Sequence, residues 1–380
     1  MNTVYLDNAA TTRVCPEAAQ AAMAAMTEQY FNPSSRYPQA AQAAKALAAH
    51  RADVARALGC KASEITFTSC GTESDNWAVR GAVELNRRKG RHIITTAIEH
   101  HAVLNPIAER EKQGFEVTYL KPTPDGSIDL DELEQAIRPD TVLVSMMLVN
   151  NELGTVLPVK EAVQILRRSN APALFHCDAV QAFMKLPFTA KELGVDLLSL
   201  SGHKIHAPKG IGALYIRSGV KLPPMILGGG QENGLRSGTE PTAQIAAFAA
   251  ACRVGQARLA EDIAHMQALK TYALERLAAD VPQVSPVVAG EAPHVLALTM
   301  AGYKSEVLVR VLGDQGICVS AGSACHRGKP SHVYAALPLS KAQRDGAFRV
   351  SFSGDSTRED VDALISALQF AAKTLFPSMS

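Results

Sequence analysis

The stretch "VDLLSLSGHKIHAPKGIG", from Val195 to Gly212, contains a nearly continuous apolar run that ends in a small polar turn. A run of this length and character is typical of a strand buried on both faces, as in a parallel sheet. Lys204 follows the run directly, after Gly202 and His203. Because functional residues of such folds gather at the carboxyl ends of strands, the stretch predicts both a sheet and a candidate site.

Five other short apolar runs, rich in β-branched residues, precede this stretch. Helix-like segments separate them, and one that begins at Pro38 stops at Gly59, a residue that suits a helix C-terminus. Strand–helix alternation predicts an α/β fold, with a mainly parallel sheet sandwiched by helices and right-handed crossovers. The runs are "EITFT" from Glu64, "HIITT" from His92, "EVTYL" from Glu116, "TVLVSMML" from Thr141 and "ALFHCDA" from Ala173.

The pattern changes near Ala243. A long helix-like stretch extends from there to about Ala278, and the apolar runs "HVLALTM", "GICVSAG" and "AFRVSFSG" follow, with a last amphipathic helix from about Thr357. We therefore expect a large domain of residues 14–254 and a smaller α+β domain of residues 1–13 with 255–380.

Composition narrows the class of protein. The 380 residues include 38 basic and 37 acidic side chains, so neither nucleic acid nor a membrane surface is expected as the main partner. No segment reaches the roughly 18 apolar residues of a membrane span. The first residues, "MNTVYLDNAATT", do not resemble a secretory signal. The seven cysteines are scattered with no C-x-x-C pair, so we expect free thiols, no metal site and a cytoplasmic location.

Three features that follow strands together predict a pyridoxal-phosphate site. A lysine partly withdrawn from water, such as Lys204, suits imine formation. Asp178, in "CDAVQ", is placed to keep the ring nitrogen of the cofactor protonated. Gly71 and Thr72, in "TSCGTESDNWA", open a helix whose N-terminus suits a phosphate. Each has an ordinary alternative: a solvated lysine, a helix cap and a simple turn.

At this point the chain resembles a cysteine desulfurase of the class V aminotransferase family, in the group with a "GSAC" catalytic loop. The resemblance covers nearly the whole chain and implies fold type I of the pyridoxal-phosphate enzymes. It also implies a homodimer with active sites near the subunit interface. The motifs are "YLDNAATT", "NPSS", "TSCGTESDN", "EHHAVL", "VNNELGT", "HCDAVQ", "SGHKIHAPKGIG", "GGGQENGLRSGTE", "VSAGSAC" and "FRVSFS".

The resemblance implies roles at the cofactor ring. Lys204 would bind the cofactor covalently and then take the Cα proton of the substrate. Asp178 would pair with the ring nitrogen and Gln181 with the ring oxygen. His100 would stack on the ring and handle protons near the substrate sulfur, whereas its neighbour His101 would be structural.

Other roles concern the phosphate and the substrate. By resemblance, Asn151 and Arg349 would bind the substrate carboxylate, for which a guanidinium fork is well suited. The alternatives are a turn residue for Asn151 and a solvated edge-strand residue for Arg349. The phosphate of the same chain would be held, with Gly71, by Thr72, Ser201 and His203, and that of the other subunit by Thr239.

Cys325 lies in "SAGSACHRGKPSH", from Ser320 to His332. The resemblance implies that its thiolate attacks the sulfur of L-cysteine, leaving L-alanine and a persulfide for an acceptor protein, either an iron–sulfur scaffold or a tRNA-thiolation enzyme. Three departures from the family pattern leave that acceptor open. They are Cys70 in the phosphate loop, expected to be buried and inert, a segment after Cys325 about two residues short, and an early end after the last helix.

Three alternatives stay open on sequence alone. A selenocysteine lyase or another class V aminotransferase shares most of these motifs. A non-catalytic relative kept as a binding partner would not need Lys204, Asp178 and Cys325 together. A Rossmann dehydrogenase ranks last, since no G-x-G-x-x-G opens the first βα unit.

Overall fold

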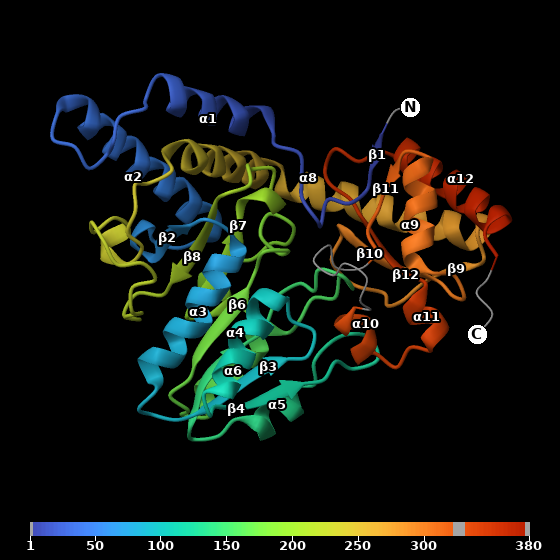
Figure 1. The fold of residues 1–380 in the computed structure, drawn as a ribbon, viewed down its shortest axis with the longest axis horizontal. Coiled ribbons are helices and arrows are strands. Elements are labelled where there is room, and N and C mark those ends of the chain that lie inside the picture. The colour runs from blue at the N-terminus through green and yellow to red at the C-terminus, as the bar shows by residue number, and fades with distance from the viewer. Residues whose placement is uncertain (1–2, 322–330, 377–380) are drawn as a thin grey trace.

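The computed structural model describes residues 3–321 and 331–376. Its larger part is built on a seven-stranded sheet in the order β2-β8-β7-β6-β5-β3-β4 (Figure 1). Neighbouring strands are parallel except that β8 is antiparallel to both β2 and β7, so the predicted mainly parallel sheet is confirmed. The strands are β2 (Ile65–Thr68), β3 (His92–Thr96), β4 (Glu116–Leu120), β5 (Thr141–Ser145), β6 (Leu174–Asp178), β7 (Leu197–Ser201) and β8 (Gly212–Ile216).

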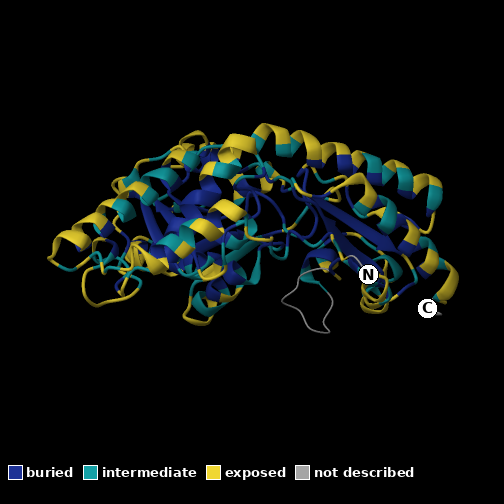
Figure 2. Ribbon diagram, turned by 90° about the horizontal axis from the view of Figure 1, so that it is seen from above, coloured by how far each residue is buried: buried dark blue, intermediate teal, exposed yellow. Residues whose placement is uncertain are grey.

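Helices cover both faces of this sheet, because successive strand residues point to opposite sides. In β3, Ile93 belongs to the core under α3 and α4, whereas Ile94 belongs to the core on the opposite face, which includes α6 and the first half of α8. The outer faces of the helices are exposed while the strands are buried (Figure 2). The helices of this part are α1 (Pro16–Thr27), α2 (Pro38–Leu58), α3 (Gly71–Asn86), α4 (His101–Lys112), α5 (Leu130–Ala136), α6 (Val159–Arg168), α7 (Ala190–Leu193) and α8 (Thr242–Asp280).

Helix ends follow the chemistry of their residues. α2 ends as predicted at Gly59, which adopts the left-handed conformation (φ 70°) that glycine reaches without a steric penalty. α3 begins at Gly71, directly after the loop that follows β2. Single 3₁₀ turns occur at Ala62–Glu64, Gly202–Lys204 and Glu232–Gly234.

The edge strand β4 differs from its prediction as a strand buried on both faces. Glu116 is exposed, and the next three residues are only half-buried. β4 has a single neighbour, β3, and therefore lacks the cover that a second neighbour would give it.

A second, smaller α+β unit follows, as expected. Its antiparallel sheet has the order β12-β10-β9, and β1 pairs in parallel with β11. It has its own apolar core, to which the N-terminal segment contributes Leu6. The elements are β1 (Val4–Tyr5), β9 (Val284–Pro286), β10 (Val295–Met300), β11 (Ile317–Cys318), β12 (Ala347–Ser351), α9 (Ser305–Asp314), α10 (His332–Ala336), α11 (Lys341–Asp345) and α12 (Arg358–Thr374).

The helix α8 connects the two units. It runs without interruption through residues 254 and 255, so no break in the backbone marks the predicted domain boundary, which stays a prediction. Within residues 3–321 and 331–376, no helix has both the length and the apolar character needed to cross a membrane.

Candidate active site

The carboxyl ends of five strands meet at one edge of the central sheet. β3, β5, β6 and β7 are parallel, and β2 shares their direction because β2 and β7 are both antiparallel to β8. At or just after these ends come Gly71, His100, Asn151, Asp178 and Lys204, and all five line a single cavity of about 210 Å³. The strand order therefore explains how Gly71 and Lys204, which are 133 positions apart, share one site.

The same cavity includes most of the other predicted site residues. It is also lined by Thr72, Gln181, Ser201, His203 and Arg349. Thr239 instead lines a separate cavity beside Phe67, and its role toward another subunit stays a prediction. Cys325 lies outside the described residues. The individual roles stay predictions.

Lys204 is anchored by the N-terminal segment of the chain. Its Nζ donates hydrogen bonds to the carbonyl oxygens of Ala9 (2.7 Å) and Ala10 (2.8 Å). Thr12 ties the same segment to the lysine turn, since its backbone N–H donates to His203 O at 2.9 Å. Side-chain chemistry predicts no function for Ala9 and Ala10, although both lie in the motif "YLDNAATT".

The start of α3 forms a seat suited to an anion. The first N–H groups of a helix lack intrahelical partners, and Cys70, which precedes Gly71, supplies no side-chain cap. Ser201 Oγ is buried and has no hydrogen-bond partner among the described residues. A Cβ at Gly71 would lie 2.9 Å from Val180 Cγ2, so the loop needs glycine there. The acidic residue of the first turn, Glu73, is neutralised by Arg236, whose Nε lies 2.9 Å from it.

The surroundings of Asp178 favour pairing of its carboxylate with a cation. One carboxylate oxygen accepts a hydrogen bond from Val180 N at 2.9 Å. Burial, and then the charge of Asp75, raise the pKa of Asp178 to about 7. A protonated ring nitrogen would stabilise the ionised form, so Asp178, Lys204 and the anion seat fit a pyridinium phosphate that bears an aldehyde.

Close to Asp178, on the same strand, lies a buried polar network that the sequence pattern does not predict. The ring of His176 is fixed by Ser145 Oγ, 2.8 Å from Nδ1, and by Ser199 Oγ, 3.0 Å from Nε2. Asp75 lies 3.5 Å from the same Nε2. Burial raises the pKa of Asp75 to about 7 and lowers the pKa of His176 to about 4. The network therefore holds a neutral imidazole under the cofactor seat.

His176 makes stability depend on pH in a definite direction. Its pKa is about 4 when folded and about 6.5 when unfolded, so the unfolded chain binds the proton more tightly. This stability is present above pH 6.5 and is lost as pH falls toward 4. We expect the loss of unfolding free energy from pH 8 to pH 5 to be about 2 kcal/mol smaller in His176→Asn than in the wild type. Urea unfolding at the two pH values measures it, and equal losses would contradict the assignment.

His100 is also neutral, for a similar reason. Burial, followed by the charge of Lys204, lowers the pKa of His100 to about 4. Its Nδ1 accepts a hydrogen bond from Ala102 N at 3.1 Å. The hydrogen of the neutral ring is therefore on Nε2, which makes that atom a donor.

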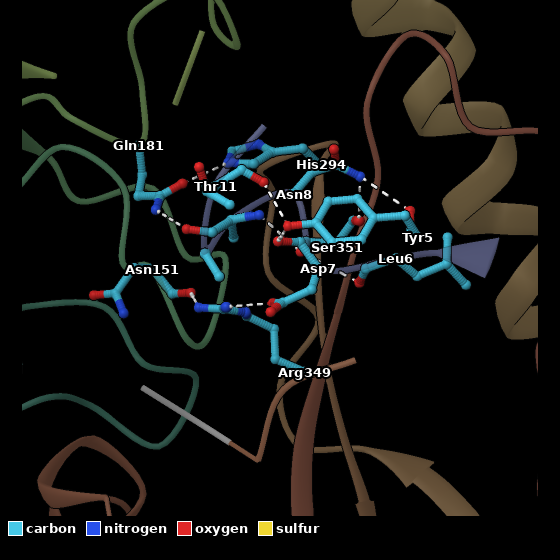
Figure 3. A network of polar contacts seen from close by, with 12 residues as sticks. Tyr5, Leu6, Asp7, Asn8, Thr11, Asn151, Gln181, His294, Arg349 and Ser351 are labelled. Atoms are coloured by element: carbon cyan, nitrogen blue, oxygen red, sulfur yellow. Dashed lines mark hydrogen bonds and ion pairs between the residues drawn. The ribbon is translucent and has the colours of Figure 1, made fainter. Parts of the chain in front are cut away.

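Arg349 is buried although it lies on an edge strand, so the alternative of a solvated arginine is wrong. Its side chain is 2% exposed and bridges the two units. One Nη donates to the backbone oxygen of Asn151 at 2.7 Å, and the other lies 2.9 Å from Asp7 Oδ1 (Figure 3). Its Nε is buried and unpartnered among the described residues. The guanidinium is thus held rigidly at the wall of the cavity.

Gln181 and His203 contact the N-terminal segment as well. Gln181 donates to Ala9 O at 2.9 Å, and its side-chain oxygen lies 3.3 Å from His294 Nε2 (Figure 3). His203 Nδ1 lies 3.2 Å from Thr11 Oγ1. Both residues therefore also fix the segment that anchors Lys204.

Cys70 does not match the expectation of a buried thiol. It is half-buried and lines the cavity. Its position between β2 and the start of α3 turns it toward the cavity instead of the apolar core, and it belongs to no core cluster of the described residues. In the part of the chain with described positions, no cluster of three or more His, Cys, Asp or Glu residues could hold a metal ion.

The cavity lies at the carboxyl edge of a mainly parallel sheet and contains a lysine, a carboxylate and the N-terminus of a helix suited to an anion. This combination defines a cofactor-dependent α/β enzyme. Residues 4–364 match the family model described as aminotransferase class V. The chain belongs to that family.

Relatives narrow the group further. The protein named cysteine desulfurase from Trichormus azollae is 42% identical over 372 residues, which cover 97% of this chain and 92% of the relative. A solved structure named NifS-like protein has a TM-score of 0.93 at 36% identity and covers 98% of this chain and 100% of its own. Another, SspA in complex with cysteine, has a TM-score of 0.79 at 35% identity and covers 93% and 100%.

Proposed function

We propose that this protein is a pyridoxal-phosphate-dependent cysteine desulfurase, which converts L-cysteine to L-alanine and transfers the sulfur to Cys325. The observation that carries the proposal is the convergence of Lys204, Asp178 and Arg349 on one cavity. The names of the relatives, together with the cysteine complex of SspA, support the substrate.

Different residues of the cavity would bind different parts of the cofactor. Gly71, Thr72 and Ser201 at the start of α3 and the end of β7 would hold the phosphate, with His203 beside them. Asp178 would keep the ring nitrogen protonated. When bound, the cofactor supplies an electron sink for the charge that remains on Cα after its proton leaves.

The substrate would be bound by Arg349. Its position is fixed by Asp7 and by the backbone of Asn151, so the guanidinium need not reorganise to pair with a carboxylate. The amine of Lys204 takes the Cα proton, and Ala9 and Ala10 offer carbonyl oxygens that stabilise its charged form. His100 donates a hydrogen bond from Nε2 toward the substrate sulfur.

Sulfur transfer then requires that one S–S bond forms and one C–S bond breaks. The thiolate of Cys325 attacks the substrate sulfur, so an S–S bond forms and the carbon–sulfur bond breaks. The electron pair of the broken bond stays with the substrate carbon, which takes up a proton and becomes the methyl group of alanine. Cα regains the proton that Lys204 holds. The products are L-alanine and a persulfide on Cys325.

The exposed side chains and the free cysteines bear on the oligomeric state and the cellular location. Large apolar side chains are exposed around α1 and α2, at Met23, Met26 and Tyr30, and in the loop before Thr239, at Leu227. Apolar patches of this kind mark interfaces and support a homodimer, in which Thr239 would approach the partner's phosphate. The six described cysteines are free, which supports a reducing cytoplasm. The sulfur acceptor would be an iron–sulfur scaffold or a tRNA-thiolation enzyme.

The test is a product assay on the purified holoenzyme. With L-cysteine and a thiol reductant, we expect alanine and sulfide in equal amounts and no keto acid. Release of a keto acid would instead identify an aminotransferase. Release of selenium from L-selenocysteine, without sulfide from L-cysteine, would identify a selenocysteine lyase. A colourless protein that binds no cofactor would overturn the proposal in favour of a binding protein.

A further inference from the structure

A second cavity, of about 670 Å³, shares no lining residue with the first. Its walls come from the start of α1, the middle of α8, the loop after β12 and the turn after Lys204. Ile205 and His206 line this cavity, whereas His203 and Lys204 line the active site. The two cavities therefore lie on opposite sides of one short turn.

A lysine whose side chain is largely buried, Lys185, lines this cavity. Lys185 is only 5% exposed, yet within the described residues its Nζ makes no hydrogen bond and no ion pair. Burial lowers the pKa of Lys185 to about 8, so most of the population is still charged at pH 7. An ammonium group largely withdrawn from water, with no protein partner among the described residues, would be stabilised by an anion in the cavity.

The acidic groups of the cavity do not provide this partner. Asp262 and Asp355 act on Lys185 only from a distance, because both face Arg258, at 3.1 and 4.0 Å. Glu17 is exposed at the rim. Arg13, also exposed at the rim, has no ion pair among the described residues. The charged lining residues balance, with Arg13, Lys185 and Arg258 against Glu17, Asp262 and Asp355. Lys185 is the one of these six that is buried, so a ligand that reaches the base of the cavity meets a positive charge.

His206 is held in an uncommon conformation at the wall of this cavity. Its φ of 66° lies in the left-handed region, which costs free energy for a residue other than glycine. Three contacts hold it there: its N–H donates to Thr12 Oγ1 (2.7 Å), its carbonyl accepts from Cys15 N (3.0 Å), and its Nδ1 lies 2.9 Å from Arg13 O. With Nδ1 engaged, Nε2 is the ring atom left to meet a ligand.

We propose that this cavity, with Lys185 at its base and His206 and Arg13 around it, is a second ligand site that binds a small oxyanion of the phosphate or carboxylate class. Nζ of Lys185 pairs with the anion, and the guanidinium of Arg13 closes on it from the rim. The N-terminal segment, pinned on both sides of the turn, keeps the site formed in advance.

The test is calorimetric titration of the pyridoxal-phosphate-loaded enzyme in chloride buffer, where the cofactor already occupies the first anion seat. Inorganic phosphate and acetate are titrated separately. For phosphate we expect one site per chain, whereas acetate can also bind at Arg349, so the comparison concerns the binding that depends on Lys185. We expect affinity at that site to be reduced about tenfold or more in Lys185→Met and unchanged in Lys191→Met, which removes an exposed lysine six residues away. Lys185-dependent binding of phosphate alone indicates a phosphate-bearing ligand, whereas Lys185-dependent binding of acetate as well shows that a carboxylate suffices.

Arg13→Gln gives a second measurement that does not depend on the folding of a core variant, because Arg13 is exposed. We expect its affinity for the bound anion to fall about threefold or more. The site is disproved if the wild type binds neither anion in the millimolar range, or if Lys185→Met and Arg13→Gln both bind as the wild type does.

Discussion

Replacing Lys204 by alanine is expected to lower the rate of alanine formation about 10³-fold or more, because a single amine carries two functions. It would hold the cofactor covalently and would take the Cα proton. The neighbouring bases do not substitute for it. Burial is the largest cause of the lowered pKa of His100 and persists in the variant, and Nδ1 of His100 is already occupied by Ala102 N–H.

The attachment itself can be measured separately from the rate. After borohydride reduction and proteolysis, mass spectrometry should find the cofactor on the peptide that contains residue 204 in the wild type, and on no lysine in Lys204→Ala. Lys209→Ala is the matched control, since Lys209 is exposed five residues along the same loop. Transfer of the cofactor to another lysine with preserved activity would refute the assignment.

The fold could be predicted because each buried strand is recognisable from its own residues. A buried parallel strand must be apolar on both faces, and β5 and β7 are fully buried along their length. β4 shows the limit of this argument. Its sequence, "EVTYL", is nearly as apolar as the others, and only the order of strands reveals that it is an edge.

The candidate site was predictable in part for the same reason. Residues at strand ends, such as Asp178 and Lys204, are positioned by the topology that the strands imply. The buried contacts between distant segments were not predictable. Arg349 and Asp7 are 342 residues apart, and the sequence carries no local sign that they pair. His176 and Asp75 likewise meet only because β6 and α3 pack together, which periodicity alone does not specify.

The N-terminal segment is the clearest case of such a contact. The motif "YLDNAATT" is visible in the sequence, but the contacts with Lys204 are made by backbone oxygens, which every residue has. Ala9 and Ala10 bind Lys204 through their carbonyl groups, so no side chain in the sequence indicates this contact. The same segment contacts both structural units and lines both cavities.

Replacing Cys325 by serine is expected to abolish sulfide release, with a loss of about 10³-fold or more, while cofactor binding is kept. A hydroxyl is not ionised near neutral pH and is a poor nucleophile toward sulfur, whereas a thiolate is a strong one. The cavity residues that bind cofactor and substrate are unchanged in this variant. L-Cysteine should therefore still alter the visible absorption spectrum of the bound cofactor, although no alanine accumulates.

Two further cysteines make this experiment decisive. Cys318, in β11 and half-buried, is a matched control whose change to serine should leave sulfide release near the wild-type rate. Cys70 is the sharper comparison, because its thiol already lines the cavity that holds Lys204 and Asp178. If Cys70→Ser stops the reaction and Cys325→Ser does not, the nucleophile is the thiol in the phosphate loop. With L-cysteine that carries labelled sulfur, loss of the label from the protein in Cys325→Ser alone would place the transferred sulfur on residue 325.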